Sequence, residues 1–331
     1  HSRSRRQRQM CIRDSFSTNQ LANGILQKDF DELLLSEEKP FFNRALRGRY
    51  PPASSIKPAI AMYGIEEGLI DWNFSIFDEG FFTLPEDGRI YRDWKEGGHG
   101  DTNLFKAITQ SSNTYFFDLA YRSDINQLNK HLSSLGFGDK ACIDCFEEDQ
   151  VFVPEPSWKM NKHNFGWFKG DTVNMGVGQG YLVSTPIQLA KYAYIMANKG
   201  KFSDLSLKKN LVKSEKSIEF SKFSNDDWFK LHESMVNVIE GNTGTARRLR
   251  EKKNYIVAAK TGTAELVSGD NREQYSETRL DDSLRDHALI IAFGPMPNPR
   301  YAVSVVVENG ESGGSVAGPV AISVLLSLIH I

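Results

Sequence analysis

The pattern of apolar and polar positions predicts a chain with helices in its middle and strands at its end. Apolar residues recur at helical spacing in several segments, whereas three later segments have the short apolar runs of β-strands. The predicted helices are 58–70, 104–121 with an interruption near Ser111, 125–135, 186–198 and 227–239. The predicted strands are 255–260, 287–293 and 301–308. This order favours an α+β fold with a helical lobe.

The segments between these elements have no long periodic pattern. Residues 16–49 combine a short strand-like start with a helical patch around 30–34, and residues 71–100 are loop-rich and aromatic. Residues 204–227 are rich in lysine and serine, so we expect them to form an excursion on the surface. The polar segment 268–284 joins the first two predicted strands and is too long for a tight hairpin.

Both ends of the chain have the features of artificial sequence. Residues 10–15 and 326–331 can be encoded by opposite strands of one DNA segment, which resembles a transposon end used in preparing sequencing libraries. We therefore predict that residues 1–15 and 326–331 are artificial, so the basic run near the start says nothing about nucleic acid or targeting. We expect residues 16–325 to be native and to come from a longer chain.

Composition adds a few limits. The formal net charge of −2 gives no indication of a nucleic-acid partner. The sequence has no run of roughly 18 or more apolar residues, the length of a membrane-spanning helix. Cys142 and Cys145 form an isolated C-x-x-C motif without the second pair of a zinc site. We expect two small buried residues, and the alternative is a local disulfide in an oxidising compartment.

The start of the first predicted helix carries a candidate nucleophile. Ser54 and Lys57 have the i, i+3 spacing, so their side chains share one helix face and can touch. A neutral lysine amine can take the serine proton, and a serine hydroxyl is a poor nucleophile without such a base. The alternative is that Ser54 caps the helix beside a solvated Lys57.

The proposed base needs support from other parts of the chain. Lys57 must lose its charge to act, so we expect partial burial and a nearby cation such as Lys260 to lower its pKa. Ser111 lies in the predicted break between helical segments and can relay a proton from Lys57 to a departing amine. Asn113, two positions further on, can hydrogen-bond a substrate amide.

A later motif, 260–263, suits the carboxylate of a peptide C-terminus. Lys260, Thr261 and Thr263 can bind this group, and Gly262 lets the substrate backbone approach an edge strand closely. On its own, this motif is better interpreted as the end of a strand followed by a turn.

The motifs S-x-x-K, S-x-N and K-T-G, in this order, resemble those of the serine-active penicillin-recognising enzymes, in which they meet in one cleft. Further segments are similar to class B penicillin-binding proteins: 43–45, 50–52, 91–94, 98–100, 170–172, 178–181 and 185–188. The segments 285–287 and 308–310 are similar to the penicillin-binding protein 2 branch, the elongation transpeptidases. The resemblance runs from about residue 16 to about residue 324.

This resemblance implies a serine β-lactamase/D,D-transpeptidase fold, in which an antiparallel sheet is flanked by helices and accompanied by a helical lobe. It implies an enzyme that cross-links peptidoglycan stem peptides during cell elongation and rod-shape maintenance, through a Ser54 acyl-enzyme that β-lactams also form. The backbone N–H groups of Ser54 and Thr263 are expected to form the oxyanion hole. No cofactor is expected to be required.

The resemblance also implies a cellular setting. Residues 16–325 are expected to be a transpeptidase domain on the periplasmic face of the bacterial inner membrane. Its N-terminal membrane anchor and pedestal domain are expected to be missing from this chain. The implied partners are a membrane-embedded glycan polymerase and a scaffold protein of the rod complex.

Two departures from the family pattern bear on the site. Ala53 stands where the family often has glycine before the nucleophile. Some close relatives bind zinc through two aspartates, a histidine and a cysteine, and here Asp78, Asp93 and His99 match the first three while Ser112 stands at the cysteine position. A serine hydroxyl is a far poorer zinc ligand than a thiolate. We expect weak zinc binding or none, and the alternative role of the three residues is to order their loop by hydrogen bonds.

Two other functions are compatible with the same motifs. A β-lactamase-like hydrolase would need a carboxylate that activates water for deacylation, and the sequence has no E-x-x-L-N segment at the expected place. The segment 178–181 also favours a transpeptidase. A non-catalytic sensor domain that β-lactams acylate would need a signalling membrane segment upstream.

Overall fold

The computed structural model describes residues 16–208, 214–252, 254–266 and 284–329. The predicted artificial segment 1–15 therefore lies outside the described residues, as does nearly all of the polar segment between the first two predicted strands. The predicted scar at the other end is partly described, because residues 326–329 continue the last helix. Within the described residues, no helix is both long enough and apolar enough to cross a membrane.

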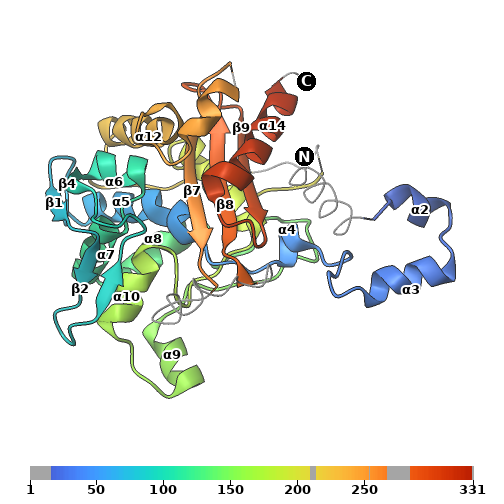
Figure 1. Cartoon of the computed structure of the whole chain (residues 1–331), viewed down its shortest axis with the longest axis horizontal. Helices are drawn as coiled ribbons and strands as arrows, with labels where there is room; N and C mark the ends of the chain where they lie inside the picture. Colours follow the sequence, from blue (N-terminus) through green and yellow to red (C-terminus); the bar gives the residue numbers. More distant parts are fainter. Residues whose placement is uncertain (1–15, 209–213, 253, 267–283, 330–331) are drawn as a thin grey trace.

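The largest sheet in the described part of the chain has three antiparallel strands in the order β7-β8-β9 (Figure 1). They are β7 (Ala258–Ala264), β8 (His287–Gly294) and β9 (Tyr301–Val307). Successive residues of a strand point to opposite faces, so β8 contributes to two cores. Ile291 faces the larger core and Ile290 faces the smaller one.

Helices cover both faces of this sheet. The larger core contains buried apolar residues of α11 (Pro186–Ala197) and four from α12 (Asn225–Glu240). The smaller core is closed by α14 (Gly318–Ile329), the short π-helix η4 (Gly313–Ala317) and the 3-10 helix η2 (Arg247–Lys252). The sheet is therefore flanked by helices, as the family resemblance implies.

A helical lobe lies beside the sheet, on the left in Figure 1. Its centre is α5 (Lys57–Glu66), whose residues 57–64 are all buried. A helix that is apolar on nearly all sides is expected inside a protein rather than on its surface. The helices that pack on it are α6 (Leu104–Gln110), α7 (Asn113–Arg122) and α8 (Ile125–Ser134). Further out, α10 (Lys169–Gly176) packs on α7, and α9 (Pro156–His163) precedes it in the chain.

Two small sheets fold the aromatic segment 71–100 back on itself. One pairs β1 with β4 and the other pairs β2 with β3. The sequence predicted a loop-rich segment here, because strands of three or four residues are too short to show an alternation of apolar and polar positions. Their bounds are Ser75–Asp78 for β1, Phe81–Thr83 for β2, Ile90–Arg92 for β3 and Gly100–Asn103 for β4. A further antiparallel pair joins β5 (Lys201–Phe202) to β6 (Lys216–Ser217), which lies within the predicted surface excursion 204–227.

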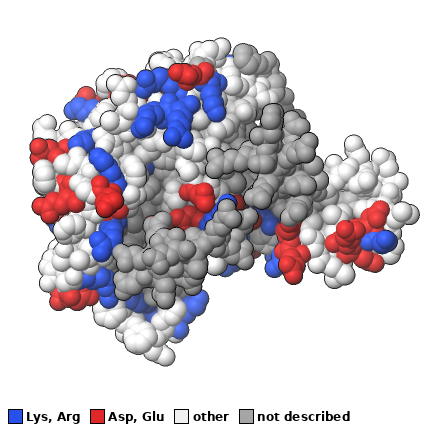
Figure 2. All heavy atoms as spheres, in the orientation of Figure 1, with Lys and Arg blue, Asp and Glu red and all other residues white. Residues whose placement is uncertain are grey.

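The N-terminal segment projects from the body of the molecule as an arm, on the right in Figure 1. It carries α2 (Thr18–Asn23) and α3 (Gln27–Leu35), neither of which has a buried residue. The predicted strand-like start is wrong, because the Ser17 hydroxyl accepts the Gln20 N–H and caps α2. Acidic side chains gather on this arm, while charges of both signs are spread over the visible body (Figure 2).

The predicted helices and strands are otherwise confirmed with shifted ends. The predicted interruption near Ser111 is real and separates α6 from α7. The first predicted strand lies later in the structure, since β7 runs through the Lys-Thr-Gly-Thr motif instead of ending there. Pairing with β8 continues as far as Ala264 opposite His287, which holds the whole motif in the sheet.

Candidate active site

The turn that carries Ser54 is hydrogen-bonded to the segment at Gly178. It forms η1 (Ala53–Ile56), a 3-10 helix that leads directly into α5. The Ala53 N–H donates to the Gly178 carbonyl at 2.8 Å, and Gly178 has φ 73°, which favours glycine. Ala53 itself has φ 49°, a region that costs an L-residue about 1 kcal/mol. The alanine that replaces the family's glycine is therefore slightly strained.

Lys57 is fully buried beneath this turn and points at the break between α6 and α7. Its Nζ donates to the Ser111 carbonyl at 2.8 Å, to the Ser112 carbonyl at 3.1 Å and to Asn113 Oδ1 at 2.7 Å. The Ser111 hydroxyl lies 3.3 Å away. The predicted contact with Ser54 is not among the hydrogen bonds between described residues, so the two side chains share a face without being bonded.

Burial controls the charge of this lysine. Desolvation lowers the pKa of Lys57 to about 7, although the negative charges of Asp93 and Asp78 raise it. Of the two predicted causes of the low pKa of Lys57, burial is confirmed, while the charge of Lys260 does not contribute. The effect runs the other way, since burial and the charge of Lys57 hold the pKa of Lys260 well below its ordinary value.

Ser111 occupies the position that a proton relay requires. Its hydroxyl lies between the Nζ atoms of Lys57, at 3.3 Å, and Lys260, at 2.8 Å. Ser111 has φ 60°, a left-handed backbone conformation, and both its hydroxyl and its carbonyl contact the Lys57 amine. Such strain in a residue other than glycine is common at functional sites. Trp94, which sequence reasoning did not assign to the site, donates its Nε1–H to the Ser111 carbonyl at 3.1 Å.

The Lys-Thr-Gly-Thr motif of β7 lies beside the turn that carries Ser54. A Cβ added to Gly262 would lie 3.3 Å from the Pro52 carbonyl and from the Ser55 nitrogen. The glycine therefore makes room for the turn itself, which differs from its predicted role of admitting substrate. Thr263 is exposed at the open edge of the sheet, where a ligand can reach it.

Two supporting residues in this strand region were not predicted. Thr245, in the loop after α12, shares a hydrogen bond of 2.7 Å between its hydroxyl and that of Thr261. Gln179 donates its side-chain N–H to the Thr263 carbonyl at 3.3 Å. Gln179 belongs to the segment 178–181 that resembles the family, whereas Thr245 lies in no segment that the sequence analysis identified. Only the folded chain indicates that either residue lies beside β7.

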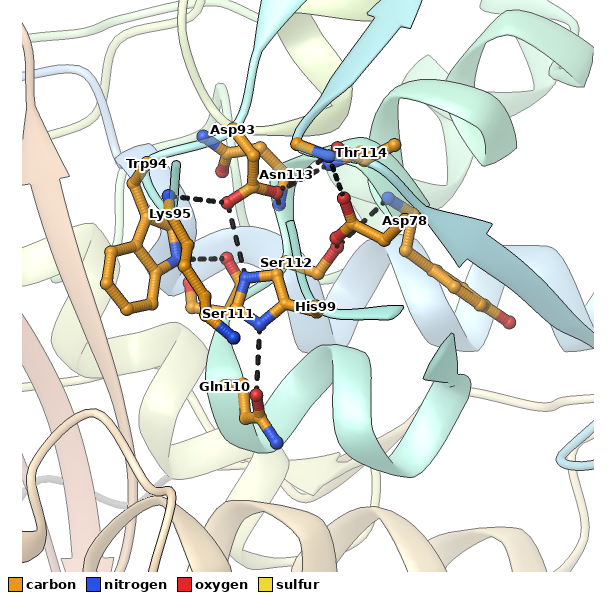
Figure 3. A network of polar contacts seen from close by, with 12 residues as sticks. Asp78, Asp93, Trp94, Lys95, His99, Gln110, Ser111, Ser112, Asn113 and Thr114 are labelled. Carbon is orange, nitrogen blue, oxygen red and sulfur yellow. Dashed lines mark hydrogen bonds and ion pairs between the residues drawn. The ribbon is translucent and has the colours of Figure 1, made fainter. Parts of the chain in front are cut away.

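The predicted loop residues do meet in space (Figure 3). Ligand atoms of Asp78, Asp93 and His99 lie within 4.8 Å of one another, and all three residues are buried. Asp93 accepts the backbone N–H groups of Asn113 at 2.6 Å and Thr114 at 2.9 Å. Burial raises the pKa of Asp93, but its hydrogen bond with His99 and the charge of Lys57 help bring it down to about 2.

These side chains are engaged with hydrogen-bond partners. Asp78 accepts the Ser112 hydroxyl at 2.7 Å and the Gly80 N–H at 2.8 Å, while His99 Nε2 lies 3.2 Å from Asp93 Oδ1. A zinc ion would have to displace several of these contacts and would find a hydroxyl in place of a thiolate. The chemistry of the donors therefore fits a hydrogen-bonded support for the Ser111–Asn113 turn better than a four-ligand zinc site.

The fold and this arrangement define a penicillin-binding protein transpeptidase domain. Residues 9–326 match the family model described as penicillin binding protein transpeptidase domain, so the chain belongs to this family. It is 39% identical over 312 residues to the peptidoglycan D,D-transpeptidase MrdA of Acinetobacter baumannii. The matched residues make up 92% of this chain and 46% of that relative. The chain spans about half the length of the curated relatives it matches.

Solved structures with this fold include two of penicillin-binding protein 2. The Pseudomonas aeruginosa protein in complex with WCK 5153 is 37% identical with a TM-score of 0.82, covering 91% of this chain and 64% of that one. The Helicobacter pylori protein in complex with MreC is 30% identical with a TM-score of 0.80, covering 93% of this chain and 55% of that one. The predicted resemblance to class B penicillin-binding proteins, and to this branch of them, is confirmed.

Proposed function

We propose that this chain is the transpeptidase part of a peptidoglycan D,D-transpeptidase that acts in cell elongation. The observation that carries the proposal is the Ser111 hydroxyl placed between the two buried amines of Lys57 and Lys260. Neutral Lys57 takes the proton of Ser54 as its oxygen attacks the carbonyl of the penultimate D-alanine. The proton then passes through Ser111 to the departing amine of the terminal D-alanine.

The rest of the cleft serves the same reaction. The N–H groups of Ser54 and Thr263 stabilise the oxyanion, Asn113 binds a substrate amide, and the Lys260–Thr263 segment binds the terminal carboxylate. An amine of a second stem peptide attacks the acyl-enzyme to form the cross-link, and water in its place gives carboxypeptidase activity. A β-lactam forms the same Ser54 ester, but no amine leaves.

We propose the cellular location and the partners of this chain from its disulfide and from a complex of a relative. Cys142 and Cys145 are both buried and joined by a disulfide, which persists in an oxidising compartment such as the periplasm. The complex of the Helicobacter pylori relative with MreC supports a scaffold partner in the rod complex. We further propose a membrane glycan polymerase as partner and an N-terminal membrane anchor in the parent protein.

Covalent labelling tests the proposal. Incubation with penicillin should add the mass of one molecule per chain, and peptide mapping should place it on Ser54. Ser54→Ala should abolish the adduct while its melting temperature stays close to that of the unmodified chain. Labelling that persists in Ser54→Ala would move the nucleophile elsewhere. Rapid turnover of nitrocefin in place of a stable adduct would favour the hydrolase.

A further inference from the structure

A buried tyrosine four residues before Ser54 is hydrogen-bonded to a glutamate at the end of β9. Tyr50 donates its hydroxyl to Glu308 Oε1 at 2.6 Å, and the residue is only 5% exposed. The other oxygen of Glu308 accepts the Arg44 Nε–H at 2.9 Å. The Tyr50 ring lies so close to Gly48 that a Cβ there would collide with it. The carboxylate thus holds two side chains of the segment that leads into the active site.

The backbone transmits the position of this tyrosine to the nucleophile. Tyr50 also exchanges two backbone hydrogen bonds with Ser184, at 2.9 and 2.8 Å. Pro51 and Pro52 follow, and because proline fixes φ, this link is stiff. The chain then enters the η1 turn with Ser54. A displacement of Tyr50 should therefore displace Ser54 by a similar amount.

Glu308 is also connected to the end of β7 through the pairing of the three strands. Glu308 follows the last residue of β9, and Val307 lies opposite Ala288 in β8. The preceding residue of β8, His287, lies opposite Ala264, which directly follows Thr263 in β7. The His287 ring also meets the Tyr50 ring edge-on, with centroids 5.4 Å apart. One cluster therefore contacts both the Ser54 segment and the end of β7.

We propose that Glu308 is a positioning residue that acts through Tyr50 to set Ser54 relative to Thr263. These two residues supply the backbone N–H groups of the oxyanion hole, so the inference rests on the proposed function. An oxyanion hole works only when its donors are already aligned on the oxygen that develops charge. Loss of the Tyr50–Glu308 contact therefore slows the acylation step and leaves the affinity of the preceding non-covalent complex unchanged.

Tyr50→Phe tests this directly, because it removes one hydroxyl and keeps the ring. Stopped-flow acylation by penicillin over a range of concentrations separates the limiting rate constant from the dissociation constant of the first complex. We expect the limiting rate constant to fall about tenfold, less than the ~10²–10³-fold that the loss of an oxyanion donor costs. The dissociation constant should change by less than about twofold, and Glu308→Ala combined with Tyr50→Phe should be no slower than the slower single variant.

A matched control is available in the same turn. Glu311 forms an exposed ion pair with Arg285 at 3.3 Å, so Glu311→Gln removes a similar charge without touching Tyr50. Its acylation should match that of the unmodified chain. Equal limiting rate constants for Tyr50→Phe, Glu308→Ala and the unmodified chain, whatever their melting temperatures, would overturn the inference. If Tyr50→Phe does not fold, Glu308→Ala decides alone. Absence of Ser54 labelling in the unmodified chain would instead overturn the proposed function.

Discussion

The two sides of the Ser111–Asn113 turn carry opposite kinds of ionisable group, amines on one side and carboxylates on the other. On the catalytic side, the Ser111 hydroxyl lies between the amines of Lys57 and Lys260. On the other side, the carboxylates of Asp78 and Asp93 hold the Ser112 hydroxyl and the Asn113 N–H. Both sides are buried, yet in the proposed reaction only the side with the two lysines carries groups whose protonation changes.

The difference shows how one turn serves chemistry and support at once. Burial lowers the pKa of Lys57, while the charges of Asp93 and Asp78 raise it, and the outcome is about 7. Asp93 also accepts two N–H groups at the start of α7, where the helix dipole favours an anion. The supporting carboxylates thus hold the backbone in place and limit how far the base is neutralised.

The largest effect is expected from Lys57→Arg, which keeps a cation on the catalytic side but removes the base. Arginine stays charged at any pH that the fold tolerates, so it cannot accept the Ser54 proton. Acylation by penicillin should slow by about 10²–10⁴-fold, as is typical for loss of base catalysis. Lys230→Arg, at an exposed ion pair, is the control and should acylate normally. Near-normal acylation by a folded Lys57→Arg chain would assign the base to another group.

The second effect is the dependence of acylation on pH. Because the pKa of Lys57 is about 7, the rate should rise about tenfold per pH unit below that value and level off above it. The ordinary value of 10.5 applies to the unfolded chain, so the unfolded chain binds more protons between these values. The contribution of Lys57 to the free energy of unfolding should therefore increase as the pH rises from about 7 towards 10.5. A flat rate profile between pH values of about 5 and 9 would contradict this titration.

Asp93→Asn is expected to have a smaller effect on both sides of the turn. The amide has one acceptor atom in place of two, so its NH2 group must face either the Asn113 and Thr114 N–H groups, now held by Oδ2, or the Lys95 N–H and His99, now at Oδ1. The lost hydrogen bonds should cost about 1–3 kcal/mol in the free energy of unfolding. Removing the charge also takes away a cause that raises the pKa of Lys57, so the midpoint of the acylation profile should move to lower pH. Asp101→Asn, at an exposed position of β4, should change neither quantity. An upward shift of the midpoint would show that Asp93 does not act on Lys57 by its charge.

The smallest effect concerns zinc on the supporting side. Purified protein should contain well under one zinc ion per chain, because Ser112 donates its hydroxyl to Asp78 and is a poor metal ligand. Ser112→Cys should raise the zinc content measured by elemental analysis, and His99→Ala in that background should lower it again. Stoichiometric zinc in the unmodified chain, lost together with thermal stability in His99→Ala, would show that three ligands are enough here.

Local patterns in the sequence were sufficient for much of the fold and for the candidate residues. The helical periodicity of α5 and the break at Ser111 depend on neighbours in the chain, and these were predicted correctly. The same holds for β8 and β9, whose apolar runs are long enough to read. Strands β1 to β4 were missed because three or four residues cannot show a period, and these strands are stable only because they pair.

The sequence by itself determined which chemical groups are present and in what order: Ser54 before Lys57, then Ser111, then Lys260. Only the tertiary structure decided what those groups can do. The pKa of Lys57 depends on complete burial and on the charges of Asp93 and Asp78, and Gly262 turned out to accommodate the turn that carries Ser54. Tyr50 and Glu308 meet across 258 positions. Desolvation and hydrogen bonding act through space, so a pattern of neighbouring residues cannot encode them.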